Sequence, residues 1–95
     1  MYAVIGRVKI KSDRADEALA MLEKGGVAML KGMAGSGSGY WARSLEGDLI
    51  QHSFWLFDTE EHARAAEATF NRLREMPAAP ATFISVEVCK VIGQA

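Results

Sequence analysis

Hydrophobic and polar residues alternate along three stretches of the chain with the period of two that is typical of β-strands. The alternation runs through Tyr2–Lys11, Leu49–Phe57 and Thr82–Ile92. A fourth strand is expected over Tyr40–Leu45. It is joined to Leu49–Phe57 by Glu46-Gly47-Asp48, a sequence typical of a hairpin turn because Gly47 can adopt positive φ. The pattern therefore predicts four strands, two of them in a hairpin.

The segment after the first strand changes to helical spacing, with apolar residues three and four positions apart. Ser12 or Asp13 can cap this helix, and the pattern continues to about Met33. Gly25-Gly26 interrupts it. Since Gly costs about 1 kcal/mol relative to Ala inside a helix, we expect the helix to bend or fray there.

The second helix follows the third strand. Asp58 can cap it and Glu61 can complete a capping box, and Pro77 and Pro80 end it. The Gly/Ser run Ala34–Gly39, which separates the first helix from the second strand, predicts a flexible connection.

The resulting order, β-α-β-β-α-β, is the split βαβ pattern of a ferredoxin-like α+β fold. It predicts a four-stranded antiparallel sheet with both helices on one face. The chain has 95 residues and shows neither a linker nor an internal repeat, so one domain is expected over residues 1–95.

Composition excludes several classes of function. The formal net charge is -1, so no basic surplus exists to hold nucleic acid. No apolar run approaches the roughly 20 residues that a membrane helix needs, and the first residues lack the order of a signal peptide. Cys89 is the single cysteine, which excludes an intrachain disulfide and favours a reducing cytoplasm. We therefore expect a cytoplasmic protein without nucleic-acid or membrane partners.

Strand alternation also predicts which side chains the helices cover. The covered face is expected to carry Val4, Val8, Ile10, Ile50, Phe54, Leu56, Ile84, Val86 and Val88, together with His52. The open face is expected to carry Ile5, Arg7, Gln51, Ser53, Trp55, Phe57, Phe83, Glu87 and Cys89. A monomer rarely exposes so much contiguous apolar surface. A two-fold homodimer through the open face would bury it and would enclose a partly polar pocket.

The order of elements and the segment SFWLFDTEEHARAAEATF, residues 53–70, resemble the antibiotic-biosynthesis-monooxygenase-like members of the dimeric α+β barrel superfamily. The Gly-rich turn that leads into YWARSLEGD fits the same layout, so the resemblance covers nearly the whole chain. It implies a homodimeric barrel. Members of this group include cofactor-free oxygenases of aromatic polyketides, haem-degrading enzymes and many proteins without known activity.

Haem-degrading members use an Asn on the first strand, a Trp near the end of the third strand and a His on the following helix. Gly6 falls at or near the Asn position, Phe57 precedes the helix start with Trp55 one pleat earlier, and Ala66 and Glu67 occupy the region of the His. The triad is not carried over. The resemblance therefore favours cofactor-free oxygenation, and no cofactor is expected.

Two charged residues are the candidate catalytic groups. Arg7 and Glu87 should face the pocket from adjacent antiparallel strands, where they could bind and polarise an enolate or carboxylate. Glu87 is also the candidate proton acceptor. The alternative is a structural ion pair, since such pairs perturb electrostatics as readily as functional ones do, or exposure of both residues at the mouth of the barrel.

The candidate substrate-binding residues are mostly aromatic. Tyr40, Trp55 and Phe57 would form a wall for a small aromatic ligand, with Ser53 beside them. The alternative for Trp55 is packing against the partner subunit.

The remaining polar residues predict no further chemistry. His52 is expected to be a partly buried, satisfied histidine and His62 a solvated one, and neither has the ligand spacing of a metal site. Cys89 is expected to behave as a small hydrophobe. The sequence thus supports two hypotheses, a cofactor-independent monooxygenase and a non-catalytic ligand-binding or structural dimer, and whether the protein is an enzyme stays open.

Overall fold

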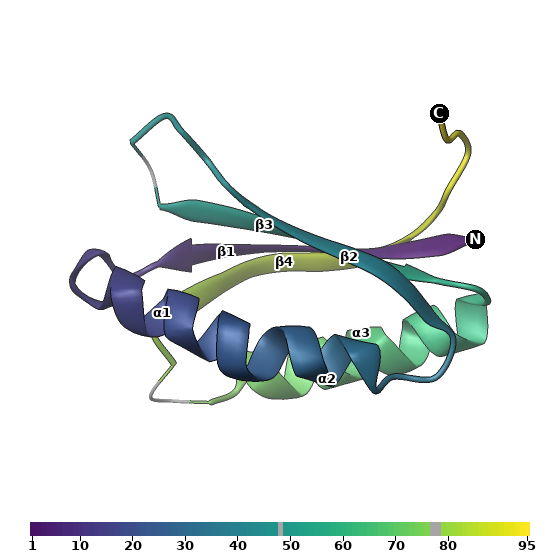
Figure 1. Ribbon diagram of the computed structural model, residues 1–95, viewed down its shortest axis with the longest axis horizontal. Coiled ribbons are helices and arrows are strands. Elements are labelled where there is room, and N and C mark those ends of the chain that lie inside the picture. Colours follow the sequence, from purple (N-terminus) through teal and green to yellow (C-terminus); the bar gives the residue numbers. More distant parts are fainter. Residues whose placement is uncertain (48, 77–78) are drawn as a thin grey trace.

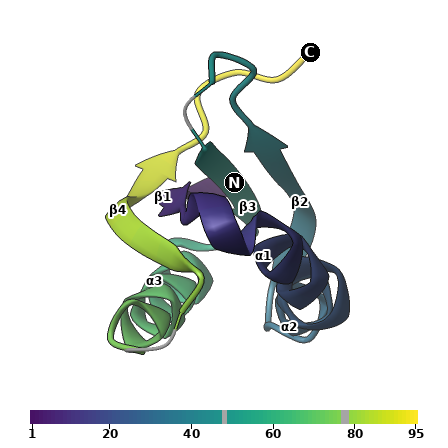
Figure 2. The same cartoon turned by 90° about the vertical axis from the view of Figure 1, so that its left-hand side faces the viewer.

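A computed structural model describes residues 1–47, 49–76 and 79–95. Its strands are β1 (Tyr2–Ile10), β2 (Ser36–Arg43), β3 (Ile50–Phe57) and β4 (Ala81–Lys90), and its α-helices are α1 (Ala15–Met21), α2 (Val27–Lys31) and α3 (Glu60–Arg74). The strands form one sheet in the order β2-β3-β1-β4, and all described pairs are antiparallel. The helices lie on one side of this sheet (Figures 1 and 2). The predicted ferredoxin-like α+β fold is therefore confirmed.

The first helical segment is continuous but changes its winding. A 3-10 turn over Ser12–Arg14 leads into α1, and a π-helical turn over Leu22–Gly26 joins α1 to α2. The interruption predicted at Gly25-Gly26 is thus a local widening of the helix, a conformation in which glycine meets little steric resistance.

The predicted helix caps are wrong in detail. Neither Ser12 nor Asp13 makes a capping bond. The N-cap of α3 is Thr59, whose extended backbone lets its hydroxyl accept from the His62 N–H at 3.2 Å. Asp58 instead contacts the His62 ring. The predicted turn residue Asp48 and the predicted helix terminator Pro77 lie outside the described residues.

The most consequential difference from the prediction concerns β3, which presents the opposite face to the helices. Val4 pairs with Trp55, Gly6 with Ser53 and Tyr2 with Phe57, so these β3 residues share the covered face with Val4. Trp55 is 3% exposed and Phe57 1% exposed. The expectation that Ser53, Trp55 and Phe57 face away from the helices is wrong.

The other β3 residues also lie on the face opposite to the predicted one. Gln51 pairs with Val8 on the covered face, whereas Ile50, His52, Phe54 and Leu56 lie on the open face. Both faces of β3 carry large apolar residues, so alternation could pair the residues correctly without deciding which set faces the helices.

A bulge reverses the first part of β4. Ser85 pairs with Arg7 and Phe83 with Val8, which leaves Ile84 as the extra residue. Phe83 consequently turns toward the helices and Ile84 is exposed, both opposite to expectation. Beyond the bulge, the predicted faces of β4 hold.

Aromatic rings fill the layer between sheet and helices. Trp55 meets Trp41 with ring centroids 6.3 Å apart, Phe70 of α3 meets Trp55 at 5.6 Å, and Phe83 meets Phe70 at 4.9 Å. Gly6 lies directly beneath this chain, since a Cβ atom there would come within 2.5 Å of the Phe70 ring. The close approach of α3 to β1 therefore depends on the absence of a side chain at Gly6.

Candidate functional site

The open face of the sheet brings charged and polar side chains together near its centre. Arg7 of β1 lies between His52 of β3 and Ser85 of β4. In the next row, Ile5 lies between Phe54 and Glu87, so that Arg7 and Glu87 are diagonal neighbours on adjacent strands. Their placement on the open face agrees with the prediction.

Exposed aromatic and aliphatic groups surround this polar centre. Tyr40 of β2 pairs with Phe54 and is 64% exposed, while Phe54 is 39% exposed. Ile84 extends the apolar surface along β4. Large apolar side chains gathered around a few polar groups are typical of a surface that meets a ligand or a partner.

The chemistry available at this surface is anion binding and proton transfer. The guanidinium of Arg7 offers donors in a planar fork that matches a carboxylate or an enolate. The imidazole of His52, on the neighbouring strand directly opposite Arg7, can accept or donate a proton. In the described parts of the chain no ion pair joins Arg7 to Glu87. We define Arg7, His52, Ser85 and Glu87 as the open-face polar cluster.

His52 was not predicted as a site residue, because the alternation in β3 was assigned to the wrong faces of the sheet and placed His52 under the helices. The signal that could have found it is the size of the aromatic pair Trp55 and Phe57. This pair buries more apolar area than Phe54 and Leu56 and so claims the core. Once Trp55 points inward, His52 must point outward.

Cys89 adjoins the cluster without adding a nucleophile. Its Sγ–H donates to Glu87 Oε1 at 3.1 Å. This hydrogen bond to a carboxylate, together with burial, raises the pKa of the Cys89 thiol and disfavours the reactive thiolate. Cys89 therefore orients Glu87 more readily than it attacks a substrate.

The covered face holds one unusual polar group. Trp55 Nε1 is buried and has no hydrogen-bond partner within the described residues, whereas the Ser53 hydroxyl donates to the Gly6 carbonyl at 3.4 Å. An unpaired buried donor costs about 1–3 kcal/mol. Trp55 is held by packing alone, and a substrate-binding role for it would require a ligand on the helix side of the sheet.

The covered face does not fit a haem group. The positions that correspond to the haem-degrading triad are Gly6, Phe57 and Ala66, and all three are buried in the layer that Phe70 fills. An Asn at Gly6 would collide with the Phe70 ring. None of these three described positions offers an iron ligand, and the Phe70 ring occupies the space next to Gly6.

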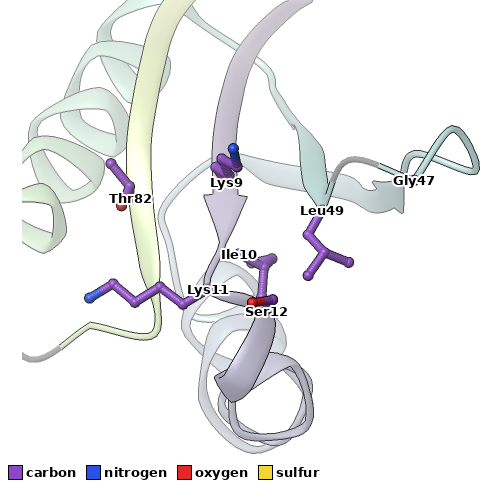
Figure 3. Close-up of a pocket in the computed structure, with 7 residues that line it drawn as sticks. All are labelled: Lys9, Ile10, Lys11, Ser12, Gly47, Leu49 and Thr82. Atoms are coloured by element: carbon purple, nitrogen blue, oxygen red, sulfur yellow. The ribbon is translucent and has the colours of Figure 1, made fainter.

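Two open depressions lie at opposite ends of the sheet. The first, of about 440 Å³, is lined by Lys9, Ile10, Lys11, Ser12, Gly47, Leu49 and Thr82 (Figure 3). The amino groups of Lys9 and Lys11 point in different directions (Figure 3), and Lys11 Nζ donates to the Ala79 carbonyl at 2.9 Å. The two lysines therefore do not converge on one anion.

The second depression, of about 480 Å³, is lined by Met1, Gly35, Ser36, Gly37, Ser38, Leu56, Phe57, Asp58 and Gln94. At its edge, Asp58 Oδ1 lies 2.6 Å from His62 Nδ1, and this hydrogen bond lowers the pKa of Asp58. The pair closes over Gly35, whose φ of 73° and lack of a Cβ atom permit the contact. His62 is thus paired, where a solvated side chain was expected.

Metal and membrane features are not found in the described parts of the chain. No group of three or more His, Cys, Asp or Glu side chains could hold a metal ion there. Among the same residues, no helix is long and apolar enough to cross a membrane.

Three solved structures show the same fold as this chain. The first is a mutant of MhuD with two manganese protoporphyrin IX groups bound per active site, at 14% identity and a TM-score of 0.73, over 100% of this chain and 98% of that one. A putative antibiotic biosynthesis monooxygenase from Bordetella bronchiseptica follows at 14% identity, a TM-score of 0.68 and 96% of both chains. A dimeric ferredoxin-like protein from an uncultured marine organism matches at 10% identity and a TM-score of 0.70, over 100% and 98%.

These likenesses establish the fold and nothing finer. No protein-family model matches the chain, and a search of curated proteins finds no match. The chain has the ferredoxin-like fold shared by antibiotic-biosynthesis-monooxygenase-like proteins. Because one fold hosts many functions, the activity has to be argued from the open face.

Proposed function

We propose that the protein forms a homodimer through the open face of its sheet and acts there as a cofactor-independent monooxygenase on a small aromatic, polyketide-like substrate. The observation that carries the proposal is the open-face polar cluster surrounded by exposed aromatic side chains. Two such faces, brought together, enclose a pocket with a cation, a proton acceptor and an aromatic wall. The single cysteine agrees with a cytoplasmic location.

The aromatic wall consists of Tyr40 and Phe54 in this proposal. They replace Trp55 and Phe57, which lie behind the sheet. A flat substrate can stack on these rings, while its oxygen substituent meets the guanidinium of Arg7. Holding the substrate in one orientation lowers the entropic part of the barrier.

The reaction begins with proton removal. His52 or Glu87 takes a proton from a CH2 group that is activated by the neighbouring aromatic system, and Arg7 stabilises the resulting anion. The anion reduces O2 by forming a carbon–oxygen bond, and the peroxide takes up the proton. Loss of water, which removes the second hydrogen of the CH2 group and breaks the O–O bond, leaves a ketone. One oxygen atom enters the product and the other leaves as water.

The alternative function is a non-catalytic dimer that binds a ligand or only assembles. One observation favours it: Ser53, Trp55 and Phe57, three of the four expected substrate-binding residues, are committed to the core. What separates the two functions is turnover that depends on the polar cluster.

The test is oxygen consumption in the presence of an anthrone, a compound that carries the required activated CH2 group. Arg7→Ala and His52→Ala should each lower kcat/KM by about 100-fold or more, the usual range for a lost electrostatic or acid–base group. Lys9→Ala, which removes a positive charge from the same strand outside the cluster, is the matched control. No oxygen uptake above the uncatalysed rate, or equal loss in all three variants, would favour the non-catalytic dimer.

A further inference from the structure

Two segments at opposite ends of the sheet project beyond its open face. One is the segment of residues 44–47 after β2, which includes Leu45, and the other is the C-terminal segment of residues 91–95, which includes Ile92. Both rise on the side away from the helices (Figures 1 and 2). We call these segments the two arms.

Each arm presents a large apolar side chain to solvent. Leu45 is 97% exposed and Ile92 is 95% exposed, the highest values among the exposed large hydrophobic residues of the described chain. Burial of such a side chain is favourable, so full exposure of two of them beside an already apolar face marks surface that an interaction covers.

From this geometry we infer that the arms grip a second copy of the chain, with Leu45 and Ile92 closing the two ends of the space between the sheets. The inference rests on the proposed homodimer and adds to it residues that each subunit contributes to the other's pocket. A second sheet docked on the open face must lie between the arms, because they rise at its two ends.

The two depressions described above lie beside the arms, at the ends of the sheet where the arms of a second copy would dock. Gly47 of the first arm lines the depression at the end of β1, and Gln94 of the second arm lines the depression beside Met1 and Leu56. Each end of the open face therefore pairs a projecting apolar residue with a hollow. A surface that carries both knob and hollow is suited to a self-complementary, two-fold interface.

The experiment is sedimentation equilibrium on the full chain, comparing the wild type with Leu45→Ser and Ile92→Ser. Each change should weaken dimerisation at least tenfold in Kd, since two arms per dimer lose their apolar contact. Leu19→Ser and Met21→Ser are the controls, because both residues are exposed large hydrophobics on α1, on the other side of the sheet. They should change Kd by less than twofold.

The outcomes separate this inference from the proposal on which it rests. A wild-type chain that stays monomeric at micromolar concentration overturns the homodimer and the arms together. A wild-type dimer whose Kd is unchanged by both arm substitutions overturns the arms alone and leaves the homodimer standing. Loss of dimerisation in the arm variants with unchanged circular dichroism supports the inference, since the subunit fold is then intact.

Discussion

At the scale of single residues, Gly6 decides how closely the helix layer approaches the sheet. A methyl group at this position would lie within 2.5 Å of the Phe70 ring and 2.8 Å of Ser53 Oγ. Neither neighbour can move freely, because Phe70 is wedged between Trp55 and Phe83. A strict steric requirement of the core thus falls on a residue without a side chain.

We expect Gly6→Ala to destabilise the protein by about 1–3 kcal/mol, the usual cost of overpacking a core. Gly25→Ala is the matched control, because nothing lies within 4 Å of a Cβ atom there and Ala is the better helix former. Urea unfolding followed by circular dichroism gives both values. A Gly6→Ala variant as stable as the control would mean that α3 is not packed as closely as the structure indicates.

At the scale of elements, the sequence predicted the strands more securely than their faces. The order of strands and helices follows from periodicity, and β1 has one plainly apolar face. In β3 the two faces are nearly equal in hydrophobicity. Which face turns toward the helices therefore depends on the tertiary packing of Trp55 and Phe57 against α3. The bulge at Ile84 likewise depends on pairing with β1, which local sequence does not encode.

This difference between the faces of β3 can be measured. Phe57→Ala should cost about 3–5 kcal/mol, as expected for a buried aromatic residue, because Phe57 is 1% exposed. Phe54→Ala should cost the isolated subunit much less, because 39% of that residue is already in contact with water. Unfolding is best followed in a range of protein concentrations that includes dilute conditions, so that subunit stability is separated from dimerisation. Equal losses for the two variants under dilute conditions would contradict the observed face assignment.

Half of the candidate site could be predicted, because only some strands had their faces assigned correctly from the sequence. Arg7 and Glu87 lie on strands whose faces were assigned correctly beyond the bulge, and Tyr40 lies opposite Phe54 on the open face, so these three lie on the proposed site. His52 and Phe54 were missed because β3 was reversed. Apart from Ser85 of β4, the missed site residues all lie on β3, whose two faces were assigned the wrong way round.

At the scale of the whole molecule, the chain shares its fold with a protein that binds a porphyrin, but its own side chains do not fit a haem group. A structural neighbour carries manganese protoporphyrin IX, but its identity to this chain is 14%, and in this chain the layer between sheet and helices is packed with side chains. Phe70 covers Gly6, and the ring chain from Trp41 to Phe83 occupies the space beside it.

We therefore expect that hemin added to the protein produces no saturable Soret shift at one haem per chain. Packed interiors resist insertion of a large ring system, because several close-packed side chains would have to move at once. A haem-binding apoprotein titrated alongside confirms that the hemin is competent. His52→Ala distinguishes weak adsorption on the open face from binding in the layer, since His52 lies on the opposite side of the sheet from Phe70. A saturable one-to-one shift that persists in His52→Ala would show that the layer opens. The candidate site would then move from the open face to the space between sheet and helices, where the unpaired Trp55 N–H would meet the ligand.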